Sequence, residues 1–253
     1  MQNEIFPPPA GHRHNRRPMR LNKFISETGA CSRREADAWI VAGRVTVNGK
    51  RAVLGTQVDT GDVVELDGQP LFAGCKDVYI ALNKPHGITC TTERHVADNI
   101  VDFIWHRARI FPIGRLDKDS EGLILLTNNG DIVNEILRVE HGHEKEYLVT
   151  VERPVTATFL AMMAAGVKIG GERTKPCVVT RSGANAFRIV LTQGLNRQIR
   201  RMCSALGYRV RHLKRVRIMH IHLGALSTGR WRDLTDAEIR PLLAAGATRS
   251  AAG

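Results

Sequence analysis

Residues 113–123 have the sequence IGRLDKDSEGL and place five charged side chains within the seven positions 115–121. The apolar run LILL at 123–126 follows at once and predicts a buried strand. A polar loop that leads into a buried strand holds its side chains on a rigid scaffold, where catalytic groups are often found. Taken alone, such a loop is more simply interpreted as a solvated surface turn, since most polar loops are solvated.

The same loop partly matches a calcium-binding EF-hand. Asp117, Asp119 and Glu121 fall at its first, third and fifth positions. The twelfth position, however, requires a bidentate Glu and here holds Asn128. Phe111-Pro112 also breaks any helix that would lead into the loop, so the spacing excludes an EF-hand.

Length and composition set the outer limits of the interpretation. A chain of 253 residues has room for one or two domains. No apolar run approaches the roughly 18 residues of a membrane helix, so we expect no membrane span. Residues 1–18 are basic and proline-rich and lack the apolar core of a secretory signal, which predicts a disordered basic arm. Residues 246–253 are small and polar and predict a flexible tail.

The cysteines and histidines argue against disulfides and metals. Five scattered cysteines, none in a Cys-x-x-Cys pair, indicate a reducing compartment, and we expect a cytoplasmic protein. Three His-x-His pairs, at 12/14, 141/143 and 220/222, lack a Cys or carboxylate at ligand spacing, so no metal is expected. No Walker loop or GxGxxG motif follows a strand, so no nucleotide cofactor is indicated.

The charge balance points to a polyanionic partner. The formal net charge is +12. Between Arg188 and Arg217 there are nine Lys or Arg residues and no acidic residue. Solvated faces normally mix both signs, so this run favours contact with phosphates, most often those of a nucleic acid.

The first predicted module spans residues 19–72. A short helix at 20–28 is followed by Ser32-Arg33-Arg34-Glu35, the pattern of a capping box at the start of a second helix. Residues 45–53 alternate around Asn48-Gly49, which predicts a hairpin, and residues 61–66 predict another strand. This order of elements resembles the S4 RNA-binding domain.

The S4 resemblance implies contacts with RNA on one basic face. The residues that it assigns to these contacts are Arg20, Lys23, Arg33, Arg34 and Lys50. A small structural add-on domain is the alternative interpretation. Residues 73–77 then serve as a linker to the second module.

The second predicted module spans residues 78–245. Strands are predicted at 78–82, 123–126, 145–151, 177–180, 187–192 and 210–218, and helices at 98–106, 131–138, 156–165, 196–206 and from 235. This order indicates an α+β fold with a mixed, mostly antiparallel sheet flanked by helices.

Three short motifs of the second module resemble the active-site motifs of pseudouridine synthases. They are GRLD at 114–117, KEY at 145–147 and GLNRQIRRM at 194–202, and the string NKPxG at 83–87 also fits. Together with an N-terminal S4 module, they resemble the RsuA family. The fuller string FPIGRLDKDS at 111–120 is similar to the RluF-type branch, which modifies one uridine of 23S ribosomal RNA. The similarity covers about residues 19–240, and it makes a catalytic role for the charged loop the preferred interpretation.

The resemblance implies an isomerisation that needs no cofactor. The bond from ribose C1′ to uracil N1 is broken, the base turns, and C1′ is joined to C5. The family places Asp117 as the catalytic carboxylate, acting either on the sugar carbon or on its 2′ proton. Tyr147 would offer a flat face to the uracil and a group for proton transfer. Arg200 is expected to pair with Asp117.

Further basic residues are expected to hold the substrate. The resemblance implies that Arg115 helps displace the target base from its stack. Arg197 is expected to lie over Arg200 on one helical face, and Arg201 to contact phosphate. Leu195 stands where many relatives carry a basic residue, although the RluF-type branch shares this feature.

The implied partner is 23S ribosomal RNA, with uridine 2604 as the target, either free or in an assembling large subunit. A non-catalytic RNA-binding or ribosome-assembly factor is one alternative, and the same chemistry on 16S rRNA or a tRNA is another. We expect a monomer, because neither module has a spare apolar stripe for a partner.

Overall fold

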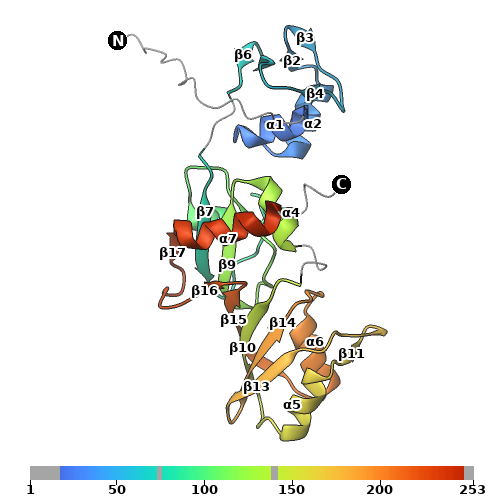
Figure 1. Cartoon of the computed structure of the whole chain (residues 1–253), viewed down its shortest axis with the longest axis vertical. Coiled ribbons are helices and arrows are strands. Elements are labelled where there is room, and N and C mark those ends of the chain that lie inside the picture. Colours follow the sequence, from blue (N-terminus) through green and yellow to red (C-terminus); the bar gives the residue numbers. More distant parts are fainter. Residues whose placement is uncertain (1–17, 73–75, 138–141, 248–253) are drawn as a thin grey trace. The chain divides into compact units, whose positions relative to one another are not determined.

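The computed structural model describes residues 18–72, 76–137 and 142–247. Contacts between Cα atoms divide the chain into two compact units, residues 1–75 and 76–253 (Figure 1). Each unit has its own buried core, so the two are described separately.

The first unit contains two short helices and two small sheets. Its helices are α1 (Leu21–Glu27) and α2 (Arg33–Val41), and its strands are β1 (Met19–Arg20), β2 (Val45–Val47), β3 (Lys50–Arg51), β4 (Gln57–Val58), β5 (Val64–Leu66) and β6 (Gln69–Pro70). The strands form a four-stranded sheet in the order β3-β2-β5-β6 and a separate β1-β4 pair. Both helices and the strands β1, β2, β4 and β5 pack into a common apolar core that includes Leu21, Ile25 and Ile40, whereas β3 and β6 are exposed.

Local signals in the sequence explain the start of α2 and the β2–β3 turn. The Ser32 hydroxyl accepts a hydrogen bond from the Glu35 amide, and the Glu35 carboxylate accepts one from the Ser32 amide, so the predicted capping box is present. Asn48 and Gly49 both have positive φ, as a tight hairpin turn with the twist of its strands requires. Asn48 also accepts a hydrogen bond from Val63, which ties the turn to the residue before β5.

The second unit is built on a nine-stranded mixed sheet. Its strands are β7 (Tyr79–Lys84), β8 (Phe111–Ile113), β9 (Glu121–Thr127), β10 (Lys145–Val151), β13 (Val178–Gly183), β14 (Ala186–Leu191), β15 (Val210–Ile218), β16 (Ile221–His222) and β17 (Trp231–Asp233). The main path is β13-β14-β10-β15-β9-β7-β17, with β16 beside β15 and β8 beside β9. Within this sheet only β9 and β15 run parallel, which confirms the predicted mixed, mostly antiparallel sheet.

Five helices and a small hairpin accompany this sheet in the described residues. They are α3 (Ile100–Ile104), α4 (Gly130–Leu137), α5 (Ala157–Ala164), α6 (Gln198–Ala205), α7 (Asp236–Ala247) and the hairpin of β11 (Lys168–Ile169) with β12 (Glu172–Arg173). Figure 1 shows α4 and α7 lying across β7 and β9, while α5 and α6 accompany β13 and β14.

Strand β9 is buried on both faces, which explains its unbroken apolar run. Leu123 and Leu125 pack in the cluster that contains residues of α4 and α7. Ile124 and Leu126 point the other way, into the cluster that contains residues of α3. All four side chains are at most 1% exposed, and each such burial contributes about 2 kcal/mol to folding. The start of β9, which follows the charged loop directly, is therefore a rigid support for that loop.

The boundaries differ from the predictions in places. Asp77, predicted to lie in the linker, accepts a hydrogen bond from the hydroxyl of Tyr79 and so packs on the second unit. Helix α7 continues to Ala247, so residues 246–247 are helical rather than part of a flexible tail. Outside the described residues lie positions 1–17 of the predicted arm at 1–18, positions 73–75 of the predicted linker and positions 248–253 of the predicted tail. Among the helices that are described, none has the length and apolarity to cross a bilayer.

Candidate active site

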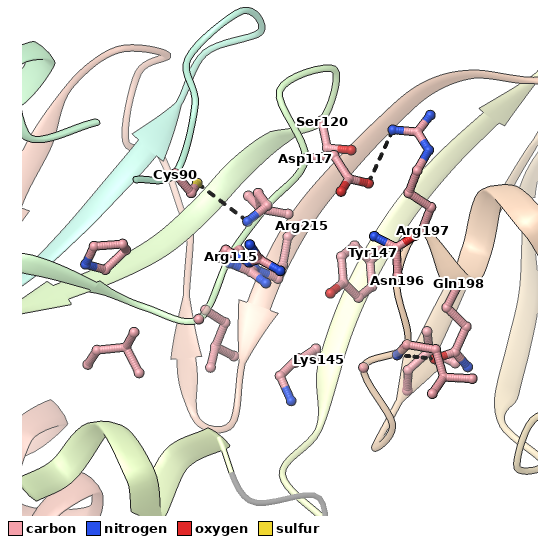
Figure 2. A pocket seen from close by; sticks show the side chains of 18 of the residues that line it. Cys90, Arg115, Asp117, Ser120, Lys145, Tyr147, Asn196, Arg197, Gln198 and Arg215 are labelled. Atoms are coloured by element: carbon pink, nitrogen blue, oxygen red, sulfur yellow. Dashed lines mark hydrogen bonds and ion pairs between the residues drawn. The ribbon is translucent and has the colours of Figure 1, made fainter. Parts of the chain in front are cut away.

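A cavity of about 700 Å³ in the second unit brings the three sequence motifs together (Figure 2). Arg115 and Asp117 reach it from the charged loop, Tyr147 from β10, and Arg197 from the loop before α6. Segments separated by up to about eighty residues thus face one space, as expected if they form one active site.

Backbone hydrogen bonds hold the charged loop in place. Gly114, with φ of +79°, turns the chain out of β8. The amide of Ser120 donates to the carbonyl of Asp117 at 3.0 Å, and the Ser120 side chain is buried. The amide of Gly87 donates to the carbonyl of Lys118 at 2.8 Å, so the NKPxG segment packs directly on this loop. The turn that carries Asp117 is therefore held by one hydrogen bond within the loop and by another from the neighbouring segment.

Lys84 of the NKPxG segment is fully buried. Its ammonium group donates to the carbonyls of Pro85 and Ile88 at 3.0 and 2.8 Å, which holds the segment in a tight turn. Burial lowers the pKa of Lys84, while nearby acidic groups partly offset this effect. The position of this side chain indicates a role in supporting the loop.

Arg197 is the cation beside Asp117. Its Nη1 lies 3.6 Å from the Asp117 carboxylate, whose side chain is about one-third exposed at 32%. The same guanidinium donates to both carboxylate oxygens of Asp119, at 3.0 and 2.9 Å. These hydrogen bonds hold the pKa of Asp119 below its ordinary value. Arg197 thus bridges the two carboxylates of the loop.

Arg200 has a different partner from the one predicted. Its guanidinium donates to the Asp119 carbonyl at 2.7 Å and lies 3.3 Å from the Ser120 hydroxyl, and its Nε is 3.4 Å from the Asp119 carboxylate. The predicted pairing of Arg200 with Asp117 is therefore wrong in this structure. The reason is geometric. Helix α6 begins at Gln198, and its N-cap residue Arg197 has left-handed backbone angles, so Arg197 is not part of the helix. Both arginines nevertheless reach Asp119, although Arg197 lies before α6 and not over Arg200 on a helical face, as had been expected.

Tyr147 lies opposite Arg215 on the neighbouring strand. The two residues are cross-strand partners in the β10–β15 pairing, and both line the cavity. The Arg215 guanidinium carbon is 6.0 Å from the centre of the Tyr147 ring. Arg215 is only 3% exposed, and its Nε donates to the Leu123 carbonyl at 2.7 Å.

Sequence reasoning missed Arg215, which it counted only as one cation of a basic run. Alternation along β15 was the available signal. Leu213 and Arg215 are both buried and two positions apart, so they face the same side of the sheet. An arginine at an inward position of a strand is unusual enough to mark a possible site residue.

Of the remaining predicted contact residues, Arg115 lines the cavity and the others lie elsewhere on the surface. Arg115 is exposed at the cavity wall, as a residue that meets the substrate would be. Arg201 is exposed on α6 and lies against Gly170 in the turn between β11 and β12, away from the cavity lining. In the first unit, Arg20, Arg33, Arg34 and Lys50 are exposed, while Lys23 forms an ion pair with Glu27 at 3.4 Å.

Comparison with known proteins decides the family. Residues 78–205 match the model of the RNA pseudouridylate synthase family, and residues 19–64 match that of the S4 domain. The chain belongs to the RNA pseudouridine synthases. It is an RluF-type member with an N-terminal S4 domain, and its reaction class is that of an isomerase.

Individual relatives support this assignment over most of the chain. The dual-specificity RNA pseudouridine synthase RluF of Escherichia coli K12 is 58% identical over 223 residues, covering 87% of this chain and 77% of the relative. The ribosomal large subunit pseudouridine synthase B of Bacillus subtilis is 33% identical, covering 89% and 96%. A crystal structure of a pseudouridylate synthase, 32% identical, matches with a TM-score of 0.64 over 88% of this chain and 99% of that one. This pseudouridine synthase therefore has the fold predicted for it.

Proposed function

We propose that this pseudouridine synthase acts through Asp117, with Tyr147 and Arg197 beside it in the cavity. The observation that carries the proposal is the convergence of these three side chains from separate elements on one space of about 700 Å³. A uracil base with its ribose fits a space of this size. Of the residues that line the cavity, Asp117 is the one carboxylate among those described.

The roles follow from the chemistry of each group. Asp117 either attacks C1′ or removes the 2′ proton, and in both cases it must be ionised and correctly aimed. The Arg197 guanidinium, at 3.6 Å, pairs with this carboxylate and restricts its orientation. Tyr147 offers its ring to the uracil and its hydroxyl for moving the proton that leaves C5. Arg115, exposed at the wall, helps bring the target base out of its stack.

We assign to Arg200 the role of stabilising the charged loop. It binds the backbone and carboxylate of Asp119 and so stabilises the turn on which Asp117 stands. Arg201 and the exposed arginines of the S4 domain contact phosphates and position the RNA.

We further propose 23S rRNA as a substrate, with uridine 2604 as the target. The large-subunit name of the Bacillus subtilis relative supports this RNA, and the dual-specificity name of the Escherichia coli relative suggests a second one. The enzyme is expected to act as a monomer, on free 23S rRNA or on an assembling large subunit.

Tritium release from RNA labelled at C5 of uridine tests the reaction, because the C5 hydrogen must leave when C1′ joins C5. We expect release from 23S rRNA by the wild type and none by Asp117→Asn, with RNA binding unchanged. Asp233→Asn, which removes an exposed carboxylate on β17, is the matched control and should keep full activity. 16S rRNA and tRNA are assayed in parallel.

Three results would contradict parts of the proposal. Appreciable release by Asp117→Asn would remove this residue from its role. Release from 16S rRNA or tRNA alone would keep the chemistry and overturn the substrate. Tight binding without release from free or assembling RNA would favour an RNA-binding factor over an enzyme.

A further inference from the structure

The buried arginine on β15 has an unused hydrogen-bond donor. Nε of Arg215 binds the Leu123 carbonyl, but Nη2 is shielded from solvent and has no hydrogen-bond partner among the described residues. A buried charged donor without an acceptor is costly, and such a group in a native protein calls for an explanation such as a catalytic role, an ordered water or an ion. Arg215 also has no ion pair with any described carboxylate.

A second cation lies on the same side of the sheet. Lys145 is two residues before Tyr147 on β10, lines the same cavity, and its ammonium group donates to the His143 carbonyl at 3.2 Å. Burial, and then the charge of Arg215, lower the pKa of Lys145. Two cations thus face a cavity in which Asp117 is already paired with Arg197. A hydrogen-bond acceptor or an anion that enters the cavity could therefore pair with both cations.

The walls decide which ligand this subsite suits. Ile113, Leu213 and Ile218 line the cavity together with the Tyr147 ring, so apolar side chains as well as polar ones surround the space that Arg215 lines. Such a surface accepts an aromatic ring that carries carbonyl oxygens more readily than a fully hydrated phosphate.

We propose that Arg215, supported by Lys145, is a catalytic residue that binds a carbonyl oxygen of the target uracil and stabilises the uracil anion formed during the reaction. This inference rests on the proposed function. When the C1′–N1 bond breaks, its electron pair stays on N1 and is shared with O2 and O4. Asp117 meanwhile bonds to C1′ or takes the 2′ proton. C5 of the turned base then bonds to C1′, while the Asp117–C1′ bond breaks or the 2′ proton returns to C2′. The C5 proton leaves and N1 takes up a proton, so bonds, charges and protons balance.

The benefit of Arg215 grows as the reaction proceeds. A neutral carbonyl accepts a hydrogen bond of ordinary strength, whereas the anion carries negative charge on the same oxygen. An interaction that is stronger in the transition state than in the bound substrate raises kcat more than it lowers the substrate Kd. Removing one such donor costs about 10²- to 10³-fold in kcat in enzymes that stabilise an oxyanion.

Substitution combined with a modified substrate tests the inference. Arg215→Gln should lower the single-turnover rate at saturating RNA at least about 10²-fold, with RNA Kd within about threefold of wild type. Arg215→Lys keeps the charge and should recover part of the rate. Arg181→Gln removes an exposed charge from β13, outside the cavity, and is the matched control. Thermal unfolding of each variant verifies the fold.

A 23S rRNA fragment with 2-thiouridine or 4-thiouridine at the target position tests whether Arg215 contacts a uracil oxygen directly or only supports the site. Sulfur is a weaker acceptor than oxygen, so one thio substitution should slow the wild type. The same substitution should slow Arg215→Gln little further, because the contact is already lost. Nucleosides are separated by chromatography after digestion.

The outcomes distinguish a failure of this inference from a failure of the proposed function. A rate of Arg215→Gln within threefold of wild type would overturn this inference alone. Thio and arginine effects that simply multiply would do the same, since they indicate a structural role. No product from the wild type on any RNA would overturn the proposed function and this inference with it.

Discussion

Gly122 of β9 lies directly against the backbone of Arg215 in β15. A Cβ atom added to Gly122 would overlap the Arg215 carbonyl oxygen, and φ of Gly122 is +100°, a conformation that other residues rarely adopt. The two residues are paired where β9 and β15 run parallel. The glycine that follows the charged loop therefore allows the close approach that places Arg215 in the cavity.

Gly122→Ala is expected to destabilise the second unit by about 3 kcal/mol or more, because the strained φ and the backbone overlap act together. Gly171→Ala is the matched control, since Gly171 has a similar φ of +94° but open space around it. The control should cost only about 1 kcal/mol. Urea unfolding of both variants gives the comparison, and equal losses would contradict the role of the close approach.

Arg197→Gln and Arg200→Gln should fail in different ways. Arg197 is 43% exposed, so its loss should change stability by less than about 1 kcal/mol while misplacing Asp117 and lowering kcat about tenfold or more. Arg200 is 13% exposed and binds the loop backbone, so its loss should also lower the free energy of unfolding by about 2 kcal/mol. Thermal unfolding and single-turnover rates measured on the same samples separate the two. A large stability loss in Arg197→Gln would contradict the view that Arg197 aims Asp117 while Arg200 stabilises the loop.

Lys84→Met should destabilise the protein by about 2–4 kcal/mol, because the carbonyls of Pro85 and Ile88 lose a charged donor in a buried site. The loop that carries Asp117 packs on this segment, so activity should fall as well. Lys168→Met, at an exposed position of β11, is the control and should unfold like the parent. A stable and fully active Lys84→Met variant would show that the segment needs no such support.

The ion pair of Arg232 with Glu238 should make stability depend on acid pH. Arg232 donates to both carboxylate oxygens of Glu238, at 2.7 and 2.6 Å, and lowers the pKa of Glu238 from 4.5 to about 2. Because the folded pKa is the lower one, this contribution is complete above pH 4.5 and is lost as pH falls towards 2. Glu238→Gln should thus cost about 2 kcal/mol at pH 7 and much less at pH 3. Urea unfolding at both values checks this, and an equal cost at both would refute it.

Arg33→Gln and Arg34→Gln should weaken RNA binding without affecting kcat at saturating RNA. Each should reduce the dependence of log K on log salt by about one unit if the side chain meets a phosphate. Both residues stand in the first turn of α2, where positive charge is unfavourable, so each substitution should leave the domain as stable or slightly more stable. Unchanged binding and salt slope would support a purely structural S4 domain.

Local rules explain why much of the fold could be predicted. The capping box at Ser32, the Asn48-Gly49 turn and the apolar run of β9 depend on neighbours in sequence, and the structure confirms all three. Short strands such as β8 and β17 were missed because their own patterns are brief, and β17 also pairs with β7, which is distant in sequence. The sequence also brought Asp117, Tyr147 and Arg197 into consideration, since each belongs to a motif.

Partners within the site depended on the tertiary structure. The position of Arg200 in the third motif suggested that it meets Asp117. Because α6 begins only at Gln198, the residue before it, Arg197, lies beside Asp117 instead. Arg215 belongs to none of the motifs used, and its burial depends on the pairing of β15 with both β9 and β10. The sequence by itself determined the longer elements, the family and the motif residues able to do chemistry, because these are set by local pattern. Only the tertiary structure decided which charges meet, because a distance of a few ångströms depends on packing between segments far apart in the chain.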